Sequence, residues 1–537
     1  MAVRRVRSAA MAAALIGCAA ALVSVPAPAS AEPASDPDSI EGLELFVDPM
    51  STTLEVAQQL SGQAREDAEL LGGIASASWF TGGTPDEVRA DVDRVVSAAD
   101  AEGTVPVLVA YNVPYRDCAL YSAGGAADTA AYNAWIDAFA DAIGDRRAVV
   151  IIEPDGLGVI PHYTNLEGAL DSCRPADADP ATAAPERFAQ LNHAVDVLAA
   201  HPGVRSYLDG TNAAWLNVGE VSSRLVSAGV ERATGFFLNV SNYLYTANNA
   251  AYGSWISSCV AYATQVAPGA FGDCGNQYWN GGPANDWQGV TMSQYGEWSA
   301  DAADHALSTA GVDSRYAQQL AGVQPTARFI IDTSRNGQGP WRYPADTYAQ
   351  HEDWCNPPDR GTGALPTTTT DEPLVDAYLW VKVPGESDGK CYRGTTGPLD
   401  PARGMEDPAA GQWFPEQARE LISFSSPQLA QPAGPACTVE ASNVQVGRAF
   451  IMTVSVTNGG SETLSPWSLS WSGDGTQKIV TALGAKFTQD GGAVTVTAAT
   501  RAPELAPGET ADVVVVGKGA AVVPSEFRLD GAVCAAA

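Results

Sequence analysis

Short apolar runs alternate with longer, Ala-rich amphipathic stretches between Leu43 and about Phe424. This alternation is typical of strands that follow helices in turn, as in α/β proteins. Strands are predicted at residues 105–111, 148–152, 205–208, 235–238, 328–331 and 377–383. Helices are predicted at residues 85–101, 132–143 and 184–200, and Thr84 can cap the first of them ahead of Pro85. This part of the chain is therefore predicted to be an α/β domain.

A different pattern begins at Cys437, where the chain becomes rich in Val and Thr. Residues 451–456 and 494–497 alternate apolar and polar positions with period two, and Gly and Pro turns separate such runs. Residues 437–537 are therefore predicted to form an all-β sandwich. Residues 425–436 are rich in Pro, Ser and Gln and are predicted to be a linker. A disulfide between Cys437 and Cys534 would tie the ends of the second domain together.

Residues 1–31 have the pattern of a secretory signal peptide. Three arginines precede an apolar run at residues 8–25, and the small residues Ala29, Ser30 and Ala31 follow it. We expect cleavage before Glu32 and a secreted, extracellular mature chain. Lipidation at Cys18 is the alternative that would anchor the chain, although more apolar residues follow that cysteine than such signals usually have. No other apolar stretch of about twenty residues occurs, so we expect no membrane attachment after the signal is removed.

The composition restricts the partners of the chain. It carries 62 acidic against 30 basic residues, a net charge of −32, which repels nucleic acid and anionic membrane surfaces. Nine cysteines are present, and the eight that remain after signal removal are an even set, which favours disulfides in an exported chain. No close Cys-x-x-Cys pair occurs, and the five histidines show no ligand spacing. We expect no metal and no cofactor.

Acidic residues follow several of the predicted strands. Hydrolysis of an acetal needs one carboxylic acid to protonate the leaving oxygen and a second group to help water attack the opposite face. Any one acid after a strand is more often a helix cap or a solvated loop residue. Five such positions with aromatic residues nearby favour a catalytic site, and they are Asp117, Glu153-Pro154-Asp155, Asp209, Asp332 and Glu386-Ser387-Asp388. Serine-hydrolase, Walker-type and zinc-protease motifs are absent.

Several runs closely resemble the signatures of glycoside hydrolase family 6, the cellulases. The first is Val109-Ala110-Tyr111-Asn112-Val113-Pro114-Tyr115-Arg116-Asp117-Cys118-Ala119, and the second is Ile151-Ile152-Glu153-Pro154-Asp155. Further matches are Asp209 followed by Trp215, Asn239-Val240-Ser241-Asn242-Tyr243, Ile331-Asp332-Thr333-Ser334-Arg335-Asn336-Gly337, Trp354-Cys355 and Lys382-Val383-Pro384-Gly385-Glu386-Ser387-Asp388-Gly389. They occur in the family's order and place a catalytic domain at residues 40–424.

This resemblance implies a distorted seven-stranded parallel β/α barrel that hydrolyses β-1,4-glucosidic bonds in cellulose with inversion. Asp155 matches the general acid, and Asp117 matches the neighbour that raises the pKa of that acid. Asp388 matches the residue usually proposed as base, acting through water. Asp209 matches a further acid, with an electrostatic or substrate-binding role, and Tyr111 matches the tyrosine that distorts the sugar at the cleavage point.

The resemblance also assigns the substrate-binding residues and the disulfides. Flat aromatic surfaces stack on sugar faces, and polar groups bind sugar edges. The tryptophans that match subsites are Trp79, Trp215 and Trp354, and the polar contacts are Asn242, Arg360, Lys382 and Glu386. The family's two disulfides match Cys118 with Cys173 and Cys355 with Cys391. Cys259 and Cys274 would then close on each other inside an insertion.

Two long segments bear on the mode of attack. Residues 243–296 and 161–185 resemble the loops that roof the cleft into a tunnel in the family's cellobiohydrolases. They favour an exo-acting enzyme that releases cellobiose from the non-reducing end, and an endo-acting β-1,4-glucanase stays open as the alternative. Asn212 and Ala123 depart from the family's usual His and Ser. These departures leave a non-catalytic glucan-binding protein as a third hypothesis.

The second domain resembles a family 2 carbohydrate-binding module. Such modules bind crystalline cellulose with three exposed coplanar aromatic side chains. In this chain the three positions carry Val446, Leu483 and Arg501, and the resemblance places Trp467 and Trp471 in the core. Because stacking on glucose is the main binding contribution, we expect a module-like fold with little affinity for crystalline cellulose. The expected partner of the whole chain is a cellulose or cello-oligosaccharide chain, and we expect a monomer.

Overall fold

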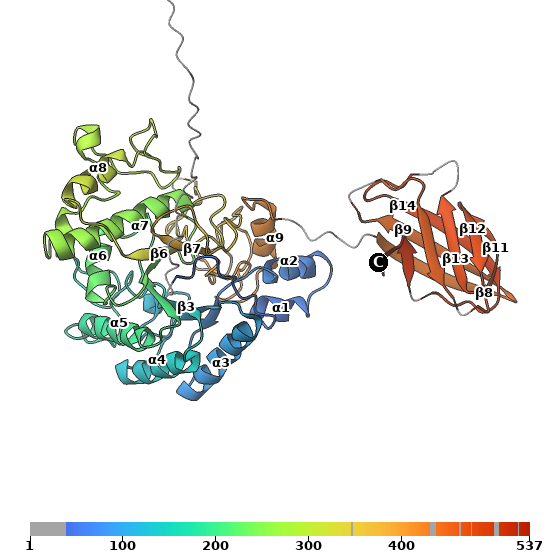
Figure 1. Cartoon of the computed structure of the whole chain (residues 1–537), viewed down its shortest axis with the longest axis horizontal. Helices are drawn as coiled ribbons and strands as arrows, with labels where there is room; N and C mark the ends of the chain where they lie inside the picture. The colour runs from blue at the N-terminus through green and yellow to red at the C-terminus, as the bar shows by residue number, and fades with distance from the viewer. Residues whose placement is uncertain are drawn as a thin grey trace, which may run out of the picture. The chain divides into compact units, whose positions relative to one another are not determined.

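The computed structural model describes residues 39–344, 347–429, 437–460, 463–473, 475–498, 504–524 and 526–536. The predicted signal peptide, most of the predicted linker and Arg501 lie outside these residues. Seven parallel strands form the sheet of the first domain in the order β1 to β7, curled into part of a barrel (Figure 1). Their bounds are β1 Ser78–Phe80, β2 Val107–Ala110, β3 Ala148–Ile152, β4 Val204–Asp209, β5 Gly235–Leu238, β6 Arg328–Asp332 and β7 Val375–Leu379. The predicted seven-stranded parallel fold is confirmed.

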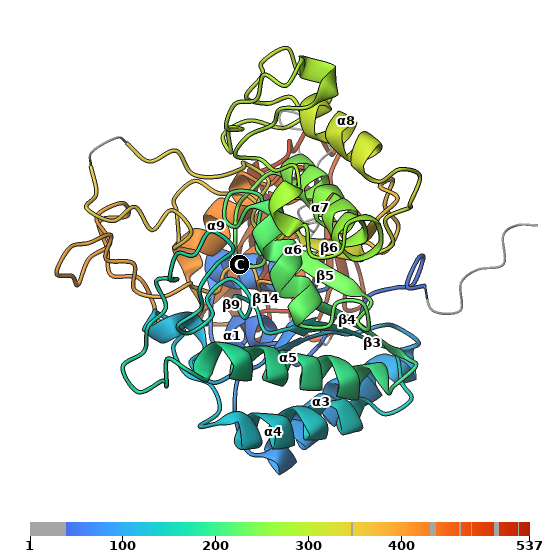
Figure 2. The same cartoon turned by 90° about the vertical axis from the view of Figure 1, so that its left-hand side faces the viewer.

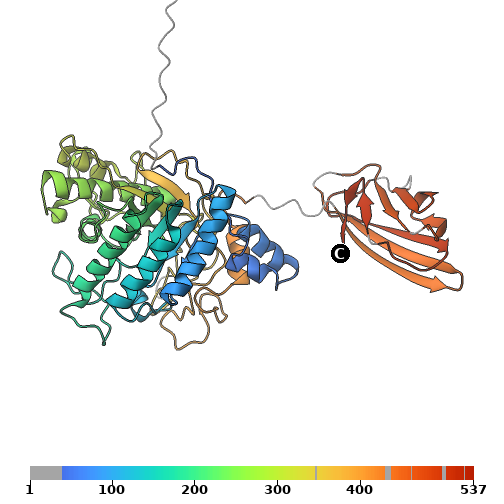
Figure 3. The ribbon, with the colours of Figure 1, turned by 60° about the horizontal axis from the view of Figure 1, so that its bottom comes forward.

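Helices cover the outside of this sheet. Their bounds are α1 Thr52–Ala57, α2 Gly62–Gly72, α3 Pro85–Glu102, α4 Thr129–Ile143, α5 Ala183–Ala199, α6 Val218–Ser227, α7 Thr246–Ala261, α8 Ala310–Gln319 and α9 Pro415–Ser423. α3, α4 and α5 lie side by side as one layer (Figure 3). At the start of α3, Thr84 Oγ1 accepts a hydrogen bond from the Glu87 amide, and the Glu87 carboxylate accepts one from the Thr84 amide. None of the helices in the described ranges combines the length and apolarity that a bilayer span requires.

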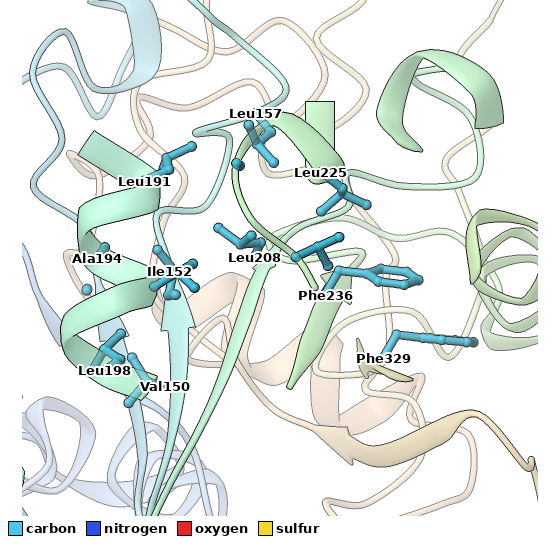
Figure 4. Packing of buried hydrophobic residues seen from close by; sticks show 14 of the residues in the cluster. Val150, Ile152, Leu157, Leu191, Ala194, Leu198, Leu208, Leu225, Phe236 and Phe329 are labelled. Atoms are coloured by element: carbon cyan, nitrogen blue, oxygen red, sulfur yellow. The ribbon is translucent and has the colours of Figure 1, made fainter. Parts of the chain in front are cut away.

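The core lies between the sheet and its helices. Every residue of β3 is buried, which explains why this strand is an unbroken apolar run. Figure 4 shows Val150 and Ile152 of β3 facing Leu191 and Leu198 of α5, with further packing between strands and helices. Both faces of this parallel sheet are covered. Functional residues of such barrels lie in the loops at the carboxyl ends of the strands.

Helices α1, α2, α6, α8 and α9 were not predicted from the sequence, and three further elements differ from the prediction. The strand predicted at residues 377–383 is β7, which ends at Leu379 because the amides of Val381 and Lys382 donate to the Asp332 carboxylate instead of to a neighbouring strand. β1 has only three residues and was not predicted. The segment 243–296, predicted to be a long loop, contains helix α7. α7 is buried on most sides, so it lacks the amphipathic pattern that would identify it.

The C-terminal domain consists of two five-stranded sheets with a core of their own. Trp467 and Trp471 are buried in that core, as predicted, whereas Val446 and Leu483 are exposed. One sheet contains β12 Ala485–Asp490, β13 Ala493–Ala498, β10 Ser468–Ser472, β15 Phe527–Leu529 and β16 Ala532–Val533. The other contains β11 Lys478–Leu483, β14 Thr510–Lys518, β9 Ala449–Asn458, β8 Cys437–Val446 and β17 Ala535–Ala536. The predicted all-β fold is confirmed.

Candidate active site

The loops that leave the carboxyl ends of the strands adopt an unusual backbone. Glu153 and Asp155 after β3, Thr211 after β4, and Asn239 and Ser241 after β5 all have φ between 53° and 68°. Residues other than glycine seldom occupy this left-handed region, and such strain concentrates at functional sites. These sharp turns occur in the loops after β3, β4 and β5, all at the carboxyl end of the sheet.

Asp155 is the most perturbed acid of this edge. Its half-buried carboxyl group receives no hydrogen bond from any described residue. Burial raises its pKa well above the ordinary range, and the charges of Asp209, Asp117 and Asp388 raise it further. Since those three charges act on it, the four acids share one electrostatic site. Asp155 is therefore suited to hold a proton and to donate it.

Asp117 is held beside this site by its own loop. Its Oδ2 atom accepts a hydrogen bond of 2.7 Å from the Ser122 amide, and its backbone φ is 57°. Burial raises its pKa to about 6, although the Ser122 amide and the Arg116 charge oppose the rise. The adjacent Cys118 is bonded to Cys173, which fastens this loop to the segment after β3.

Asp209 supports the loop that carries Asp155. Its Oδ2 atom accepts hydrogen bonds from the amides of Leu157, at 3.1 Å, and Gly158, at 3.0 Å. Its Oδ1 atom accepts one from Thr211 at 2.8 Å. Burial raises the pKa of Asp209 to about 6 against these bonds. Both oxygens of Asp209 are thus occupied by backbone amides, two of them in the loop that carries Asp155.

Asp388 lies in a positively charged setting. Its Oδ2 atom is 2.8 Å from Arg335 Nη1 and accepts a hydrogen bond of 3.0 Å from the Asn356 amide. Lys382 Nζ is 3.7 Å from the other oxygen. Burial alone would raise the pKa of Asp388, but the Arg335 and Lys382 charges outweigh it and lower the pKa below its ordinary value. Asp388 is therefore an ionised carboxylate, which contrasts with Asp155.

Two of the candidate acids have structural roles. Glu153 is buried and accepts hydrogen bonds from the amides of Asn112 and Val113, and burial raises its pKa to about 7. Asp332 is also buried, and its oxygens accept hydrogen bonds from backbone amides of three loops. Both acids bind neighbouring strand-end loops together. Neither presents a free oxygen to a substrate.

Aromatic side chains surround the acids. The ring of Tyr111 meets that of Trp79 edge to face at 5.4 Å, and the Arg116 guanidinium lies 4.6 Å from the Tyr111 centroid. Trp79 Nε1 donates to the Val381 carbonyl at 2.8 Å, which fixes the plane of its half-buried indole. Trp215 lies against Gly158, where an added Cβ would come within 2.3 Å of its ring. The glycine thus lets the indole approach the loop that follows Asp155.

The remaining predicted binding residues come from the loops after β5, β6 and β7. The ring of Trp354 is 5.9 Å from that of Tyr121, whose hydroxyl group donates to Glu352. The four polar residues already form hydrogen bonds within the protein. Lys382 donates to the Ser387 carbonyl, Arg360 to the Gly339 carbonyl and Asn242 to the Val240 carbonyl. Glu386 accepts a hydrogen bond from the Thr52 hydroxyl group. Their contact with a sugar stays a prediction.

The four expected disulfides are all formed: Cys118–Cys173, Cys259–Cys274, Cys355–Cys391 and Cys437–Cys534. Among the described residues, the one group with metal-ligand spacing is Cys391, Asp400 and Asp407. Its sulfur is in a disulfide, and Asp400 is paired with the buried Arg393. This donor set does not suit a metal ion.

Sequence reasoning did not single out the groups that hold Asp388. Arg335, Asn356 and Tyr243 reach it from different loops, and Tyr243 donates its hydroxyl hydrogen to Asp388 at 3.3 Å. Arg335 and Tyr243 do occur in the matched runs, so their position was a usable signal. The sequence around Asn356 gave no signal of this contact, except that the residue follows the matched pair Trp354-Cys355.

This arrangement of acids and aromatic rings agrees with comparisons to known proteins. Residues 40–425 match the sequence model of Glycosyl hydrolases family 6. The chain belongs to this family. It is a cellulase that hydrolyses β-1,4-glucan. Residues 437–534 match a second model, Cellulose binding domain.

Individual relatives of this cellulase have both modes of action in their names. Endoglucanase A of Thermobispora bispora is 30% identical over 513 residues, covering 92% of this chain and 91% of that protein. A probable 1,4-beta-D-glucan cellobiohydrolase C of Neosartorya fischeri is 28% identical over 367 residues, 63% of this chain and 66% of that one. The solved endoglucanase Cel6 of Mycobacterium tuberculosis, bound to a thio-linked cellobioside, is 30% identical with a TM-score of 0.50, covering 71% of this chain and 97% of that one.

Proposed function

We propose that Asp155 protonates the leaving glycosidic oxygen and that Asp388 receives a proton from the attacking water. Inverting hydrolysis needs one protonated and one ionised carboxyl group at the same site. The opposite pKa shifts of these two acids support this division of labour, since Asp155 is raised and Asp388 is lowered. This contrast is the observation on which the mechanism rests.

The other site residues serve these two steps. Asp117 keeps the pKa of Asp155 high through its like charge, and Asp209 fixes the Asp155 loop. Tyr111 presses on the sugar at the cleavage point, while Trp79, Trp215 and Trp354 stack on neighbouring sugar rings. Asn242, Arg360, Lys382 and Glu386 hydrogen-bond to sugar hydroxyls. The substrate is a cellulose or cello-oligosaccharide chain, and no cofactor takes part.

We further propose exo action with release of cellobiose from the non-reducing end. Support comes from the two long segments, residues 161–185 and 243–296. The Cys118–Cys173 disulfide fastens the first to the loop of Asp117, and Cys259–Cys274 closes within the second. The second segment reaches Trp215 directly, because Tyr278 donates its hydroxyl hydrogen to the Trp215 carbonyl at 2.6 Å. Fastened segments of this kind can enclose a chain and restrict cleavage to its end.

Endo action is a second candidate, because Endoglucanase A of Thermobispora bispora matches this chain over most of both lengths. Two measurements separate the candidates. An exo-acting enzyme should release soluble sugar from cellulose with little fall in the viscosity of carboxymethylcellulose. An endo-acting enzyme should lower that viscosity early, which would contradict the exo proposal.

The reaction itself is tested with soluble substrate. Incubation of cellotetraose with the enzyme, followed by NMR of the fresh products, should reveal α-cellobiose before mutarotation. Release of the β-anomer would contradict inversion. Absence of any product would favour a non-catalytic glucan-binding protein.

We also propose that the enzyme is secreted. Four disulfides in one chain support an oxidising compartment, because such bonds persist mainly outside the cytosol. Expression in the native host followed by assay of culture medium and cell lysate should place the activity in the medium. Activity confined to the membrane fraction would favour lipidation at Cys18.

A further inference from the structure

Exposed aromatic side chains are unevenly distributed over the molecule. Among the described residues, four of them are more than a third exposed: Tyr278 at 42%, Trp279 at 42%, Trp287 at 50% and Phe424 at 41%. Three of these four lie between α7 and α8, in the segment that surrounds α8 at the top of Figure 2. The described residues of the C-terminal domain expose none. Clustered exposure of large apolar rings indicates an interaction site.

The rings of the cluster are closely packed against the loop that carries them. Trp279 lies against the backbone of Gly281 and Gly289, where an added Cβ would come within 2.4 Å and 2.8 Å of its ring atoms. The rings of Trp279 and Trp287 are nearly parallel, with centroids 6.5 Å apart and an angle of 21° between their planes. Glycine contacts therefore support the Trp279 ring, while 42% of its surface stays exposed to solvent.

Two asparagines hold the loop beneath these rings. Asn280 is buried, and its side chain donates to the carbonyls of His305 and Ser308 and accepts from the Val290 amide. Asn285 accepts from the Gly282 amide at 2.8 Å. The loop displays Trp287 with φ of 59°. Such a strained, hydrogen-bonded loop presents its rings in one arrangement, which lowers the entropy lost on binding.

The cluster is joined by hydrogen bonds to the segment that carries Trp215 of the candidate active site. Tyr278 donates to the carbonyl of Trp215 at 2.6 Å, and Gln277 donates to that of Leu216 at 2.9 Å. The Trp215 indole in turn lies against Gly158 in the loop after Asp155. A glucan chain that stacks on Trp215 would therefore find further aromatic rings next to it, in the segment that is hydrogen-bonded to Trp215.

We propose that Tyr278, Trp279 and Trp287 form a surface site, here named the aromatic shelf, that binds a β-1,4-glucan chain beyond Trp215. The proposal rests on the proposed function, since it needs a glucan chain in the cleft. Flat rings stack on the apolar faces of glucose, which is the same chemistry that the cleft uses. The shelf gives the cellulase a cellulose-binding surface within its catalytic domain.

The test compares full-length variants on two substrates. The shelf variant is Trp279→Ala with Trp287→Ala, and Phe424→Ala is the matched control because it removes the exposed aromatic residue that lies outside the shelf. Depletion of protein by microcrystalline cellulose in the cold measures binding. We expect the apparent Kd of the shelf variant to rise about tenfold or more. The Phe424 variant should bind like wild type.

Hydrolysis of cellotetraose by the same proteins separates the two proposals. We expect the shelf variant to keep the wild-type kcat on this short substrate, which shows that its fold and cleft are intact. If the double variant unfolds, the single Trp287→Ala change is compared instead, because this side chain is the more exposed of the two. Unchanged cellulose binding in the variant, or no binding by wild type, overturns the shelf. Failure of wild type to cleave cellotetraose overturns the proposed function instead.

Discussion

The two domains bury different kinds of side chain. The barrel domain buries charged groups at the carboxyl end of its sheet, among them Glu153, Arg187, Asp209, Asp332, Arg335, Lys382 and Asp388. The described residues of the C-terminal domain bury no charged side chain, and their buried polar groups are Asn458 and Gln477. Its core is aliphatic and aromatic.

This difference shows where each domain places its polar groups: the barrel gathers buried charges at the end of the sheet that carries the candidate site, whereas the C-terminal core is apolar. A buried charge destabilises a fold unless it is paired, so clusters of buried charges indicate a functional site. An apolar core does not indicate where a functional site lies. The barrel also exposes the rings of the aromatic shelf, whereas the C-terminal domain exposes the aliphatic Val446 and Leu483 where a binding module would carry aromatic residues.

The largest expected effect is on catalysis. Asp155→Asn should lower kcat on cellotetraose by about a hundredfold to ten-thousandfold, the usual contribution of a general acid. A substrate with an activated leaving group should recover part of the loss, because it needs less protonation. The control is Asp512→Asn, an exposed acid of β14 in the other domain, which should leave kcat unchanged. Wild-type activity in the Asp155 variant would contradict the assignment.

The next largest effect is on stability. Asp388→Ala leaves Arg335 buried without its carboxylate partner, so the free energy of unfolding of the barrel should fall by about 3–5 kcal/mol. The exposed pair of Arg528 and Glu526 is the matched case in the C-terminal domain, and Glu526→Ala should cost less than about 1 kcal/mol. Calorimetry that resolves both transitions measures each change. Equal losses of unfolding free energy in the two domains would contradict the claim that the buried ion pair matters more than the exposed one.

A smaller effect is expected from pH. Burial raises the pKa of Glu153 to about 7 and those of Asp117 and Asp209 to about 6. A carboxyl group with a raised pKa binds its proton more tightly in the folded state, so its contribution to stability is present below pH 4 and is lost as pH rises through 6 to 7. Asp388, with a lowered pKa, acts in the opposite direction at low pH.

The Tm of the barrel should therefore be highest in mildly acidic solution and lower at pH 8. The transition of the C-terminal domain is the internal reference, and it should move less because its described residues bury no carboxyl group. Asp117→Asn should flatten the dependence of the barrel and shift the alkaline limb of activity to lower pH. A barrel Tm that increases from pH 5 to pH 8 would contradict the burial argument.

The smallest effect is expected at the aliphatic positions of the C-terminal domain. Val446→Ser with Leu483→Ser in the full chain should leave cellulose binding unchanged, because aliphatic side chains do not stack on glucose. Residues 437–537 alone should likewise fail to deplete from solution with crystalline cellulose. Substantial binding by this fragment would place the cellulose-binding surface in the C-terminal domain and weaken the comparison.

Much of the fold could be predicted because it depends on local patterns. The strands at residues 148–152 and 235–238 are apolar runs, and the structure has β3 and β5 at the same positions. The Thr84 cap of α3 was equally readable. α7 could not be predicted from periodicity, because neighbouring elements cover most of its sides. β1 is too short to have a pattern of its own.

The sequence by itself determined which residues could do chemistry: Asp155 and Asp117 stand in recognisable runs, and residue order places them after strands. Only the tertiary structure decided how the acids divide their roles. Asp209 and Asp332 are the last residues of β4 and β6, yet backbone amides from other loops occupy their oxygens. Asp388 is ionised because Arg335 reaches it from another strand end. Burial, charge and hydrogen bonds between distant segments set a pKa, and these exist only once the chain has folded.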